Sequence, residues 1–402
     1  MFSRRTHWKL TKNAYTEALE RFRASGRELL DLTASNPTEV GLQYESERLL
    51  RALASPHVLE YEPVAKGLLP AREAVAGYYA EKGIAVSPEQ IFLTVSTSEA
   101  YTYAFRLLCD PGDEVLVPQP SYPLFEFLAN LQDVRLVPYE LIYDHGWQID
   151  FHSLECAITA ETRAVLVVHP NNPTGSYVKG EEKRLLDRIC EKHEIAVIAD
   201  EVFLDYELSK DSAPLSLQQQ ARRVRHEALS FAGSRGALTF TLSGLSKISG
   251  LPQMKAAWIV LSGPESMAQD ASERLEVIAD TYLSPNAPVQ WALPEMLATR
   301  AGIQQQLSAR VRENLAVLDG ELSRQKMCQR LGVEGGWYAI LRVPATRPDE
   351  ELAIELLEHE GVLVQPGHFY DFASDGYLVV SLITQARVFA AGVEKVIAFL
   401  AK

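Results

Sequence analysis

Residues 164–175 read Ala-Val-Leu-Val-Val-His-Pro-Asn-Asn-Pro-Thr-Gly. The first five are almost continuously apolar, as in a strand that is buried on both faces of a parallel sheet. A second run of this kind, 196–199, follows an amphipathic helical pattern over 181–193, and polar residues follow both runs. Strands that alternate with helices predict a mostly parallel sheet with helices on both faces.

The same alternation extends from about residue 90 to residue 260. Apolar runs predict further strands at 91–95, 114–118, 134–138, 239–242 and 256–261. Helical patterns occupy 98–108 and 122–131 within this region, and longer ones continue from 264 to about 325. The last part mixes strands with helices, at 337–343, 349–360, 377–381 and 386–400.

We therefore predict an α/β protein in three parts. Residues 46–290 form a large domain with a mostly parallel sheet, and residues 291–402 form a smaller α+β domain that includes an interdomain helix. An N-terminal segment, 1–45, packs with the smaller domain. A chain of this length buries enough surface to need no disulfide or metal to hold its core.

Composition excludes several classes of function. The 402 residues include 39 Lys and Arg against 53 Asp and Glu, a formal charge of −14. An acidic surface repels phosphate backbones and anionic lipid, so we expect no nucleic-acid and no membrane partner. No apolar run follows Arg4-Arg5, and nowhere do ~18 apolar residues occur in succession, so a secretory signal and a spanning helix are not expected.

The cysteines and one basic cluster have ordinary interpretations. Cys109, Cys156, Cys190 and Cys328 are far apart and lack the spacing of metal ligands. We expect four reduced core cysteines in a cytoplasmic protein. We expect Arg222, Arg223 and Arg225 to form a solvated helix face.

Lys247 is the residue with the most specific surroundings. It lies in Ser-Gly-Leu-Ser-Lys-Ile-Ser-Gly-Leu-Pro-Gln-Met-Lys, residues 243–255, where small, apolar and turn-forming residues precede a second cation, Lys255. A lysine near apolar surface and another cation loses its proton readily, and an unprotonated amine can attack a carbonyl carbon. The alternative is a loop with an ordinary surface lysine.

Polar residues follow three of the predicted strands. Asn172 comes after the strand 164–168, and Asp200 comes directly after 196–199. Ligands in open α/β sheets bind outside the carboxyl ends of the strands. Thr97 and Ser98 follow 91–95 and open a helix, where free N–H groups and two hydroxyls suit a phosphate. Each of these residues, taken alone, is also compatible with a helix cap.

Together and in this order, these residues resemble the class I/II aminotransferases of the fold type I pyridoxal-phosphate family. The most specific matches are Asn171-Asn172-Pro173-Thr174-Gly175, Asp200-Glu201-Val202, and Ser246-Lys247 with Gly250 and Lys255. Weaker matches lie at 35–38, 61–67, 110–115 and 118–123. The resemblance covers nearly the whole chain and implies the aspartate aminotransferase-like fold, with pyridoxal 5'-phosphate as cofactor.

The resemblance also implies roles for the residues around the cofactor ring. Lys247 would hold the cofactor as a Schiff base and then move the proton at the substrate's α-carbon. Asp200 would pair with the pyridine nitrogen and keep it protonated, which makes the ring a better electron sink. Asn172 would donate to the ring's phenolate oxygen, and Tyr122 would stack on the ring.

The cofactor phosphate would be held by a separate group of residues. That group consists of Thr97, Ser98, Ser246 and Lys255. Tyr61 would reach the phosphate of the neighbouring subunit. The resemblance therefore implies a homodimer with shared active sites.

Four positions depart from the family pattern. Phe203 stands among the cofactor-binding residues where the family usually has tyrosine, Lys255 replaces arginine, and Gly244 stands where many members have serine. Val379 stands where members that use α-amino acids carry the arginine that grips the carboxylate. Either the register differs, or another cation such as Arg387 or Lys66 serves, or the amino donor lacks a conventional α-carboxylate.

The resemblance implies a ping-pong aminotransferase that exchanges an amino group between an amino acid or amine and a 2-oxo acid. A carbon–sulfur or other β-eliminating lyase on the same scaffold shares the first proton abstraction and stays an alternative. A non-catalytic, cofactor-binding regulator is the remote alternative. We expect Asn36, Val379 and Tyr338 to lie on the substrate side, with Trp337 and the aromatics at 368–370, which predicts a fairly hydrophobic donor. For these aromatics, packing in the apolar core is an equal alternative. His169 is expected to be structural.

Overall fold

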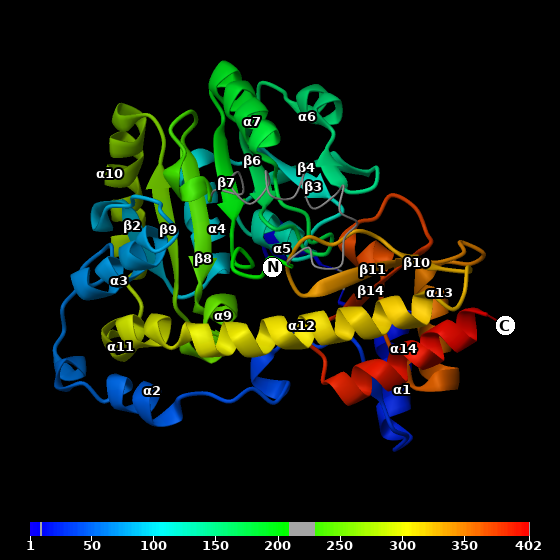
Figure 1. The fold of residues 1–402 in the computed structure, drawn as a ribbon. Helices are drawn as coiled ribbons and strands as arrows, with labels where there is room; N and C mark the ends of the chain where they lie inside the picture. The colour runs from blue at the N-terminus through cyan, green and yellow to red at the C-terminus, as the bar shows by residue number, and fades with distance from the viewer. Residues whose placement is uncertain (9, 209–229, 402) are drawn as a thin grey trace.

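The computed structural model describes residues 1–8, 10–208 and 230–401 (Figure 1). It consists of a large, twisted sheet covered by helices, a smaller sheet, and a long helix that runs along both (Figure 1). Arg222, Arg223 and Arg225 lie outside the described residues, so the helix face expected there stays a prediction.

The large sheet has eight strands in the order β2-β9-β8-β7-β6-β3-β4-β5. β9 is antiparallel to both of its neighbours and β5 is antiparallel to β4, whereas β8, β7, β6, β3 and β4 form parallel pairs. The strands are β2 Ile91–Thr94, β3 Glu114–Gln119, β4 Arg135–Tyr143, β5 Trp147–Ile149, β6 Thr162–Val168, β7 Ala196–Asp200, β8 Thr239–Gly244 and β9 Ala257–Ser262. The predicted α/β fold with a mostly parallel sheet is therefore confirmed.

Helices cover both faces of this sheet because its central strands are apolar on both faces. In β6, Leu166 and Val168 belong to a core with residues of α4 and α10, whereas Val165 and Val167 belong to a core with residues of α6 and α7. Burying each such side chain contributes about 1.5–3 kcal/mol. These helices are α4 Thr97–Leu108, α6 Phe151–Ala157, α7 Gly180–His193 and α10 Glu265–Tyr282.

The smaller sheet is antiparallel, in the order β10-β11-β14-β13. Its strands are β10 Gln329–Arg330, β11 Tyr338–Arg342, β13 Gln365–Pro366 and β14 Tyr377–Ser381. A second, two-stranded parallel sheet joins β1 Leu30–Asp31 to β12 Val362–Leu363. The helices of this region are α1 Ala14–Ala24, α13 Asp349–Glu355 with the π-helical turn η7 Leu356–Glu360, and α14 Ala386–Leu400. The three-part division at 1–45, 46–290 and 291–402 remains a proposal.

One long helix, α12 Arg300–Leu322, passes from beside the large sheet to the smaller one (Figure 1). At the small-sheet end, the side-chain amide of Asn314 is buried and donates to the backbone oxygens of Leu382 at 2.9 Å and Thr384 at 2.7 Å. At the other end, α12 follows α11 Ala287–Ala298, which packs against α2 Ser46–Leu53 and α3 Leu69–Ala80.

Two predictions made from the sequence are wrong in detail. The helix expected over 122–131 is α5, Phe125–Asn130, because Tyr122 precedes Pro123 and the residue before a proline avoids the helical conformation. The expectation of four core cysteines fails at Cys156, which is exposed on α6. All four cysteines are free thiols.

Among the described residues, no helix combines the length and the apolar character needed to cross a membrane.

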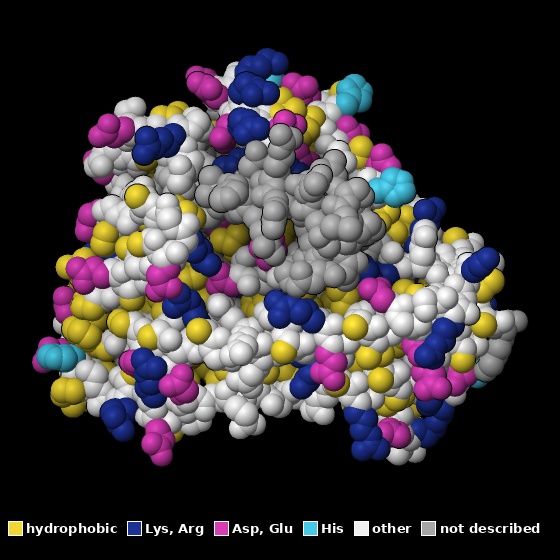
Figure 2. Space-filling view, viewed as in Figure 1, with side chains coloured by type: hydrophobic (Ala, Val, Ile, Leu, Met, Phe, Trp, Pro, Cys, Tyr) yellow, Lys and Arg dark blue, Asp and Glu magenta, His cyan; other side chains and the backbone are white. Residues whose placement is uncertain are grey.

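Short helical turns complete the secondary structure. The 3-10 turns are η1 Arg4–Thr6, η2 Pro37–Glu39, η3 Pro56–Leu59, η4 Pro88–Gln90, η5 Phe231–Gly233, η6 Pro252–Met254 and η8 Gly367–Tyr370. The four-residue helix α9, Leu245–Ile248, follows β8 directly and carries Lys247. Lysine and arginine side chains are interspersed with acidic ones on the face shown in Figure 2.

Candidate active site

Lys247 lies where three parts of the chain meet. Its Nζ is 4.8 Å from the centre of the Trp337 ring, 5.6 Å from that of Phe203 and 3.4 Å from the backbone oxygen of Ser35. Burial lowers the pKa of the Lys247 amine from 10.5 to about 8, and the negative charge of Asp200 only partly opposes this. Desolvation penalises the charged form of a lysine, so its neutral, nucleophilic form becomes accessible near neutral pH.

Asp200 supplies the buried charge that faces this lysine. It ends β7, next to β8, so its carboxylate lies at the carboxyl edge of parallel strands. The hydroxyl of Tyr101 donates to Oδ2 at 2.7 Å, and the N–H of Val202 donates to Oδ1 at 3.0 Å. Burial raises the pKa of Asp200, while these two hydrogen bonds and the charge of Lys247 act in the opposite direction. A positive ring nitrogen would complete the pairing of this carboxylate.

Aromatic rings form the walls around the two charges. Phe203 is buried and meets Trp337 edge-on, with centroids 5.2 Å apart, and Tyr338 at 6.3 Å. Tyr122 is 37% exposed, and burial together with the charge of Asp200 raises the pKa of its hydroxyl to about 12. Because the pKa lies far above neutrality, Tyr122 stays a neutral ring at physiological pH.

The beginning of α4 offers hydrogen-bond donors without partners. Ser96 caps the helix by accepting from the N–H of Glu99 at 3.1 Å. The N–H groups of Thr97 and Ser98, the two residues between Ser96 and Glu99, have no acceptor among the described residues. Free N–H groups at a helix N-terminus bind phosphate, and the helix dipole adds to the attraction. The half-buried Ser246 and the exposed Lys255 follow β8 in sequence.

Two neighbouring asparagines have different local roles. The side-chain oxygen of Asn171 accepts from both the N–H and the hydroxyl of Thr174, at 3.3 and 3.1 Å, and so builds the turn after β6. The side-chain oxygen of Asn172 is buried and has no partner. A buried polar group costs free energy unless it is paired, so Asn172 points to a ligand that is absent from the folded chain itself.

The structure places other predicted residues outside this group. Tyr61 is 82% exposed and lies in a groove with Leu283 and Trp291. The side-chain oxygen of Asn36 accepts from Thr38 within its own turn, at 3.1 Å from the nitrogen and 2.8 Å from the hydroxyl. Val379 is fully buried in β14 between β11 and β13.

The two cations considered as substitutes for an arginine at 379 have other surroundings. The ammonium of Lys66 is 3.8 Å from the carboxylate of Glu276 and 3.9 Å from that of Glu89, and it donates to the backbone oxygen of Glu89 at 3.0 Å. Arg387 is exposed in the first turn of α14. His169 is buried, and its Nδ1 accepts from the N–H of Val178 at 3.0 Å.

Three residues at the site were not singled out from the sequence. Tyr101, the donor to Asp200, lies one helical turn after Thr97, so the spacing of four residues in α4 could have indicated it. Tyr206 donates to the backbone oxygen of Lys247 at 2.6 Å. Ser35 approaches Lys247 from a distant part of the chain through its backbone, which no side-chain pattern reveals.

A sequence profile of the family described as aminotransferase class I and II matches residues 27–391. The chain belongs to this family. Among relatives of this aminotransferase, the alanine aminotransferase of Mycobacterium tuberculosis is 29% identical over 401 residues, which covers 94% of this chain and 87% of the relative. The glutamate-pyruvate aminotransferase AlaA of Escherichia coli is 27% identical over 375 residues, 90% of this chain and 88% of that one. The protein is therefore an aminotransferase of a pyridoxal-phosphate-dependent family.

Solved structures show the same fold. An alanine aminotransferase from Pyrococcus furiosus superimposes on this aminotransferase with a TM-score of 0.87 at 22% identity, covering 100% of both chains. A Thermus thermophilus aspartate aminotransferase mutant gives a TM-score of 0.81 at 24% identity, again over 100% of both chains. The predicted aspartate aminotransferase-like fold is thereby confirmed.

The candidate site fits the cofactor that this family uses. Pyridoxal phosphate presents a phosphate, a ring nitrogen that is positive when protonated, a phenolate oxygen and an aldehyde. The site presents two free N–H groups at Thr97 and Ser98, a buried carboxylate at Asp200, an unpartnered side-chain oxygen at Asn172 and an amine of lowered pKa at Lys247. The phosphate, the ring nitrogen and the aldehyde each have a chemically matched group, whereas the phenolate oxygen would need the Asn172 amide to present its NH₂ group in place of its oxygen.

Proposed function

We propose that the chain transfers an amino group between an amino acid or amine and a 2-oxo acid, with pyridoxal phosphate bound covalently to Lys247. The observation that carries this proposal is the Lys247 amine, whose pKa burial lowers to about 8 and which faces Asp200. Pyridoxal phosphate supplies an electron sink for the pair of electrons left at the substrate's α-carbon when its proton departs.

The protein's own residues would do the rest. Lys247 Nζ would take the proton from the substrate's α-carbon and then deliver it to the cofactor. Asp200 would hold a proton on the ring nitrogen, and Tyr101 would keep that carboxylate oriented through its 2.7 Å hydrogen bond. Thr97, Ser98, Ser246 and Lys255 would hold the phosphate. Desolvation by Phe203 and Trp337 strengthens the charge interaction between Lys247 and Asp200.

We propose an amino donor with a fairly hydrophobic body. Support comes from the aromatic rings of Phe203 and Trp337 at Lys247, and from Tyr338, whose ring lies 6.3 Å from that of Phe203. Position 379 also holds a valine, which cannot form the two parallel hydrogen bonds with which an arginine grips a carboxylate.

We also propose that the enzyme works as a homodimer in which Tyr61 reaches the partner's cofactor phosphate. Tyr61 is 82% exposed and Leu59 is 91% exposed, close to a groove that Leu68, Leu283 and Trp291 line. Large exposed apolar side chains around a groove are typical of protein interfaces. Hydrophobic side chains gather on this side of the molecule, at the left of Figure 2.

A donor panel tests the reaction. The cofactor-loaded protein is incubated with alanine, glutamate, aspartate, an aromatic amino acid or a primary alkylamine that bears an aromatic ring, each with and without a 2-oxo acid. Transfer of the amino group from a hydrophobic donor to the 2-oxo acid is the expected result. Activity confined to aspartate and glutamate would contradict the proposed donor class. Release of ammonia and a 2-oxo acid from a single substrate, without an acceptor, would indicate elimination instead.

A further inference from the structure

The turn that carries Lys247 is held by side chains from three other parts of the chain. The Lys247 backbone oxygen accepts from the hydroxyl of Tyr206 at 2.6 Å. The next residue, Ile248, accepts from Nε2 of Gln304 at 3.0 Å, and the Gly250 oxygen accepts from the hydroxyl of Tyr44 at 2.7 Å. Helix ends leave carbonyl oxygens without intrahelical partners. These three donors add to the turn's backbone hydrogen bonds, among them the long one from the Gly250 N–H to the Lys247 oxygen at 3.4 Å.

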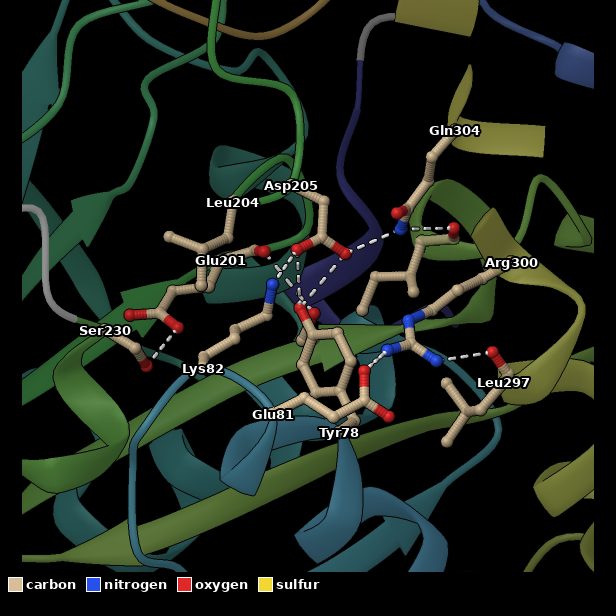
Figure 3. A network of polar contacts seen from close by, with 12 residues as sticks. Tyr78, Glu81, Lys82, Glu201, Leu204, Asp205, Ser230, Leu297, Arg300 and Gln304 are labelled. Carbon is tan, nitrogen blue, oxygen red and sulfur yellow. Dashed lines mark hydrogen bonds and ion pairs between the residues drawn. The ribbon is translucent and has the colours of Figure 1, made fainter. Parts of the chain in front are cut away.

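The Gln304 amide is itself fixed by a buried charge. Its Nε2 also donates to Oδ2 of Asp205 at 2.7 Å, so one nitrogen joins the carboxylate to the backbone of the lysine turn. The Asp205 side chain is 4% exposed and forms an ion pair with Lys82, and the hydroxyl of Tyr78 donates to it at 3.2 Å (Figure 3). Three donors, one from α3, one from the turn directly after it and one from α12, therefore point at one carboxylate (Figure 3).

Holding Gln304 with a buried ion pair costs more folding free energy than a neutral hydrogen-bond partner would. A buried ion pair gains little net stability, because both charges must leave water, and a side-chain amide could satisfy the Ile248 oxygen without a carboxylate beside it. The Asp205 carboxylate holds the Gln304 amide in one orientation, because a charged acceptor binds Nε2 more firmly than a neutral acceptor does. Asp205 also precedes Tyr206 in sequence, so the same short segment fixes the Lys247 carbonyl.

We infer that Gln304 and Asp205 are positioning residues that hold the backbone of Lys247 and Ile248, so that the Lys247 amine stays in its desolvated place beside Asp200. The inference rests on the proposed role of Lys247. It also makes α12, which continues to the smaller sheet, part of the support of the reactive lysine.

We expect Gln304 and Asp205 to affect the pKa of Lys247 by holding its position and not by their own charge. Asp200 is the described residue whose charge acts on Lys247. The other groups packed against the amine are the rings of Phe203 and Trp337 and the backbone oxygen of Ser35, none of which titrates. If the turn loosens, water reaches the amine, and the desolvation that lowers its pKa is reduced.

The first test compares two substitutions in the same helix. Gln304→Met keeps the length of the side chain and removes the donor. Gln305→Met is the matched control, since Gln305 is the next residue of α12, is exposed, and its side chain makes no hydrogen bond among the described residues. Amide hydrogen exchange of peptide 245–251 and the pKa of Lys247, from pH-dependent competitive labelling of the cofactor-free full-length chain, are measured for each.

For Gln304→Met we expect exchange across 245–251 to be about tenfold faster and the pKa of Lys247 to rise by about one unit, with kcat of the loaded enzyme about tenfold lower and KM within about twofold. Gln305→Met should match the unsubstituted protein. If Gln304→Met matches Gln305→Met in exchange and in the pKa of Lys247, the inference is wrong.

The second test keeps the inference falsifiable if a lone buried charge prevents folding. Asp205 is changed in a Lys82→Met background, once to Asn, which retains an acceptor for Gln304, and once to Leu, which does not. The Asn variant should lie between the unsubstituted protein and the Leu variant in its exchange rates and in the pKa of Lys247, because a neutral acceptor holds Gln304 less firmly than a carboxylate does, and the Leu variant should resemble Gln304→Met. Equal behaviour of the two would overturn the inference. Failure to label Lys247 with cofactor in the unsubstituted protein would instead refute the proposed function.

Discussion

The hydroxyl of Tyr101 donates to Asp200 at 2.7 Å, and both side chains are buried. The tyrosine comes from α4, the helix whose first N–H groups are free, and the aspartate ends β7. One hydrogen bond thus joins the element proposed to hold the cofactor phosphate to the carboxylate proposed to hold the ring nitrogen. Hydrogen bonds to charged groups are among the stronger ones in proteins.

Tyr101→Phe should weaken cofactor binding about tenfold or more, because a hydrogen bond to a charged group contributes about 1.5–3 kcal/mol. Its loss should also raise the pKa of Asp200 further, because this hydrogen bond lowers it. Equilibrium titration of the cofactor-free chain with pyridoxal phosphate measures the effect. The control is Tyr103→Phe, in the same helix, whose hydroxyl interacts with Glu99 instead. Equal dissociation constants for the two variants would contradict the proposed role of Asp200.

Lys247→Met should stabilise the cofactor-free protein at pH 7. The folded chain holds the lysine with a pKa of about 8 and the unfolded chain with 10.5, so below pH 8 folding costs up to about 3 kcal/mol at this residue. Between pH 8 and 10.5 the unfolded lysine binds more proton than the folded one, so the unsubstituted protein gains stability as pH rises and the difference from the variant narrows. Urea unfolding at several pH values measures the difference in the free energy of unfolding between Lys247→Met and the unsubstituted protein. A difference that does not change with pH would be inconsistent with a buried amine at Lys247.

The strands of the large sheet and the helices that cover it were predictable, because turn residues bound each segment. Within a segment, the spacing of apolar residues fits either a strand or a helix. In the smaller sheet and its helices, β14 and α14 also occur over the predicted residues, 377–381 and 386–400. The hairpin strand β5 was missed, because its three residues contain only one alternation of exposed and buried side chains. Cys156 could not be placed from a seven-residue helix, since periodicity over two turns does not separate core from surface.

The site was predictable only where a side chain follows a strand. Lys247, Asp200 and Asn172 each follow a strand of the large sheet, and neighbouring parallel strands place their carboxyl ends together. Contacts between distant parts of the chain, such as Ser35 with Lys247 or Gln304 with Ile248, leave no trace in local sequence. For the same reason, the ion pairs that occupy Lys66 could not be foreseen.

Val379→Arg should destabilise the protein by about 3 kcal/mol or more, because it would bury an unpaired charge in a packed sheet. Val379→Ile, which adds only a methylene, should cost about 1–3 kcal/mol. Urea unfolding of both variants and the donor panel check this prediction. A stable Val379→Arg variant that gains activity with aspartate or glutamate would show that position 379 opens into the substrate site, against the proposed donor class.

Mixing two inactive variants tests the shared active site. Lys247→Ala removes the proposed nucleophile, and Tyr61→Ala removes the residue proposed to act on the partner's site. In a dimer, a hybrid would contain one site with both defects and one intact site, so an equal mixture should recover about a quarter of full activity after subunit exchange. A mixture that stays as inactive as its components would contradict the intersubunit role of Tyr61, and an active monomer on size analysis would refute the dimer.

The most direct test of the central proposal is the covalent attachment of the cofactor. The protein is loaded with pyridoxal phosphate, reduced with borohydride, digested and mapped by mass spectrometry. The account predicts a single reduced cofactor adduct on Lys247, prevented in Lys247→Ala and unaffected in Lys255→Ala at saturating cofactor. Attachment at another lysine, or no attachment at all, would contradict it.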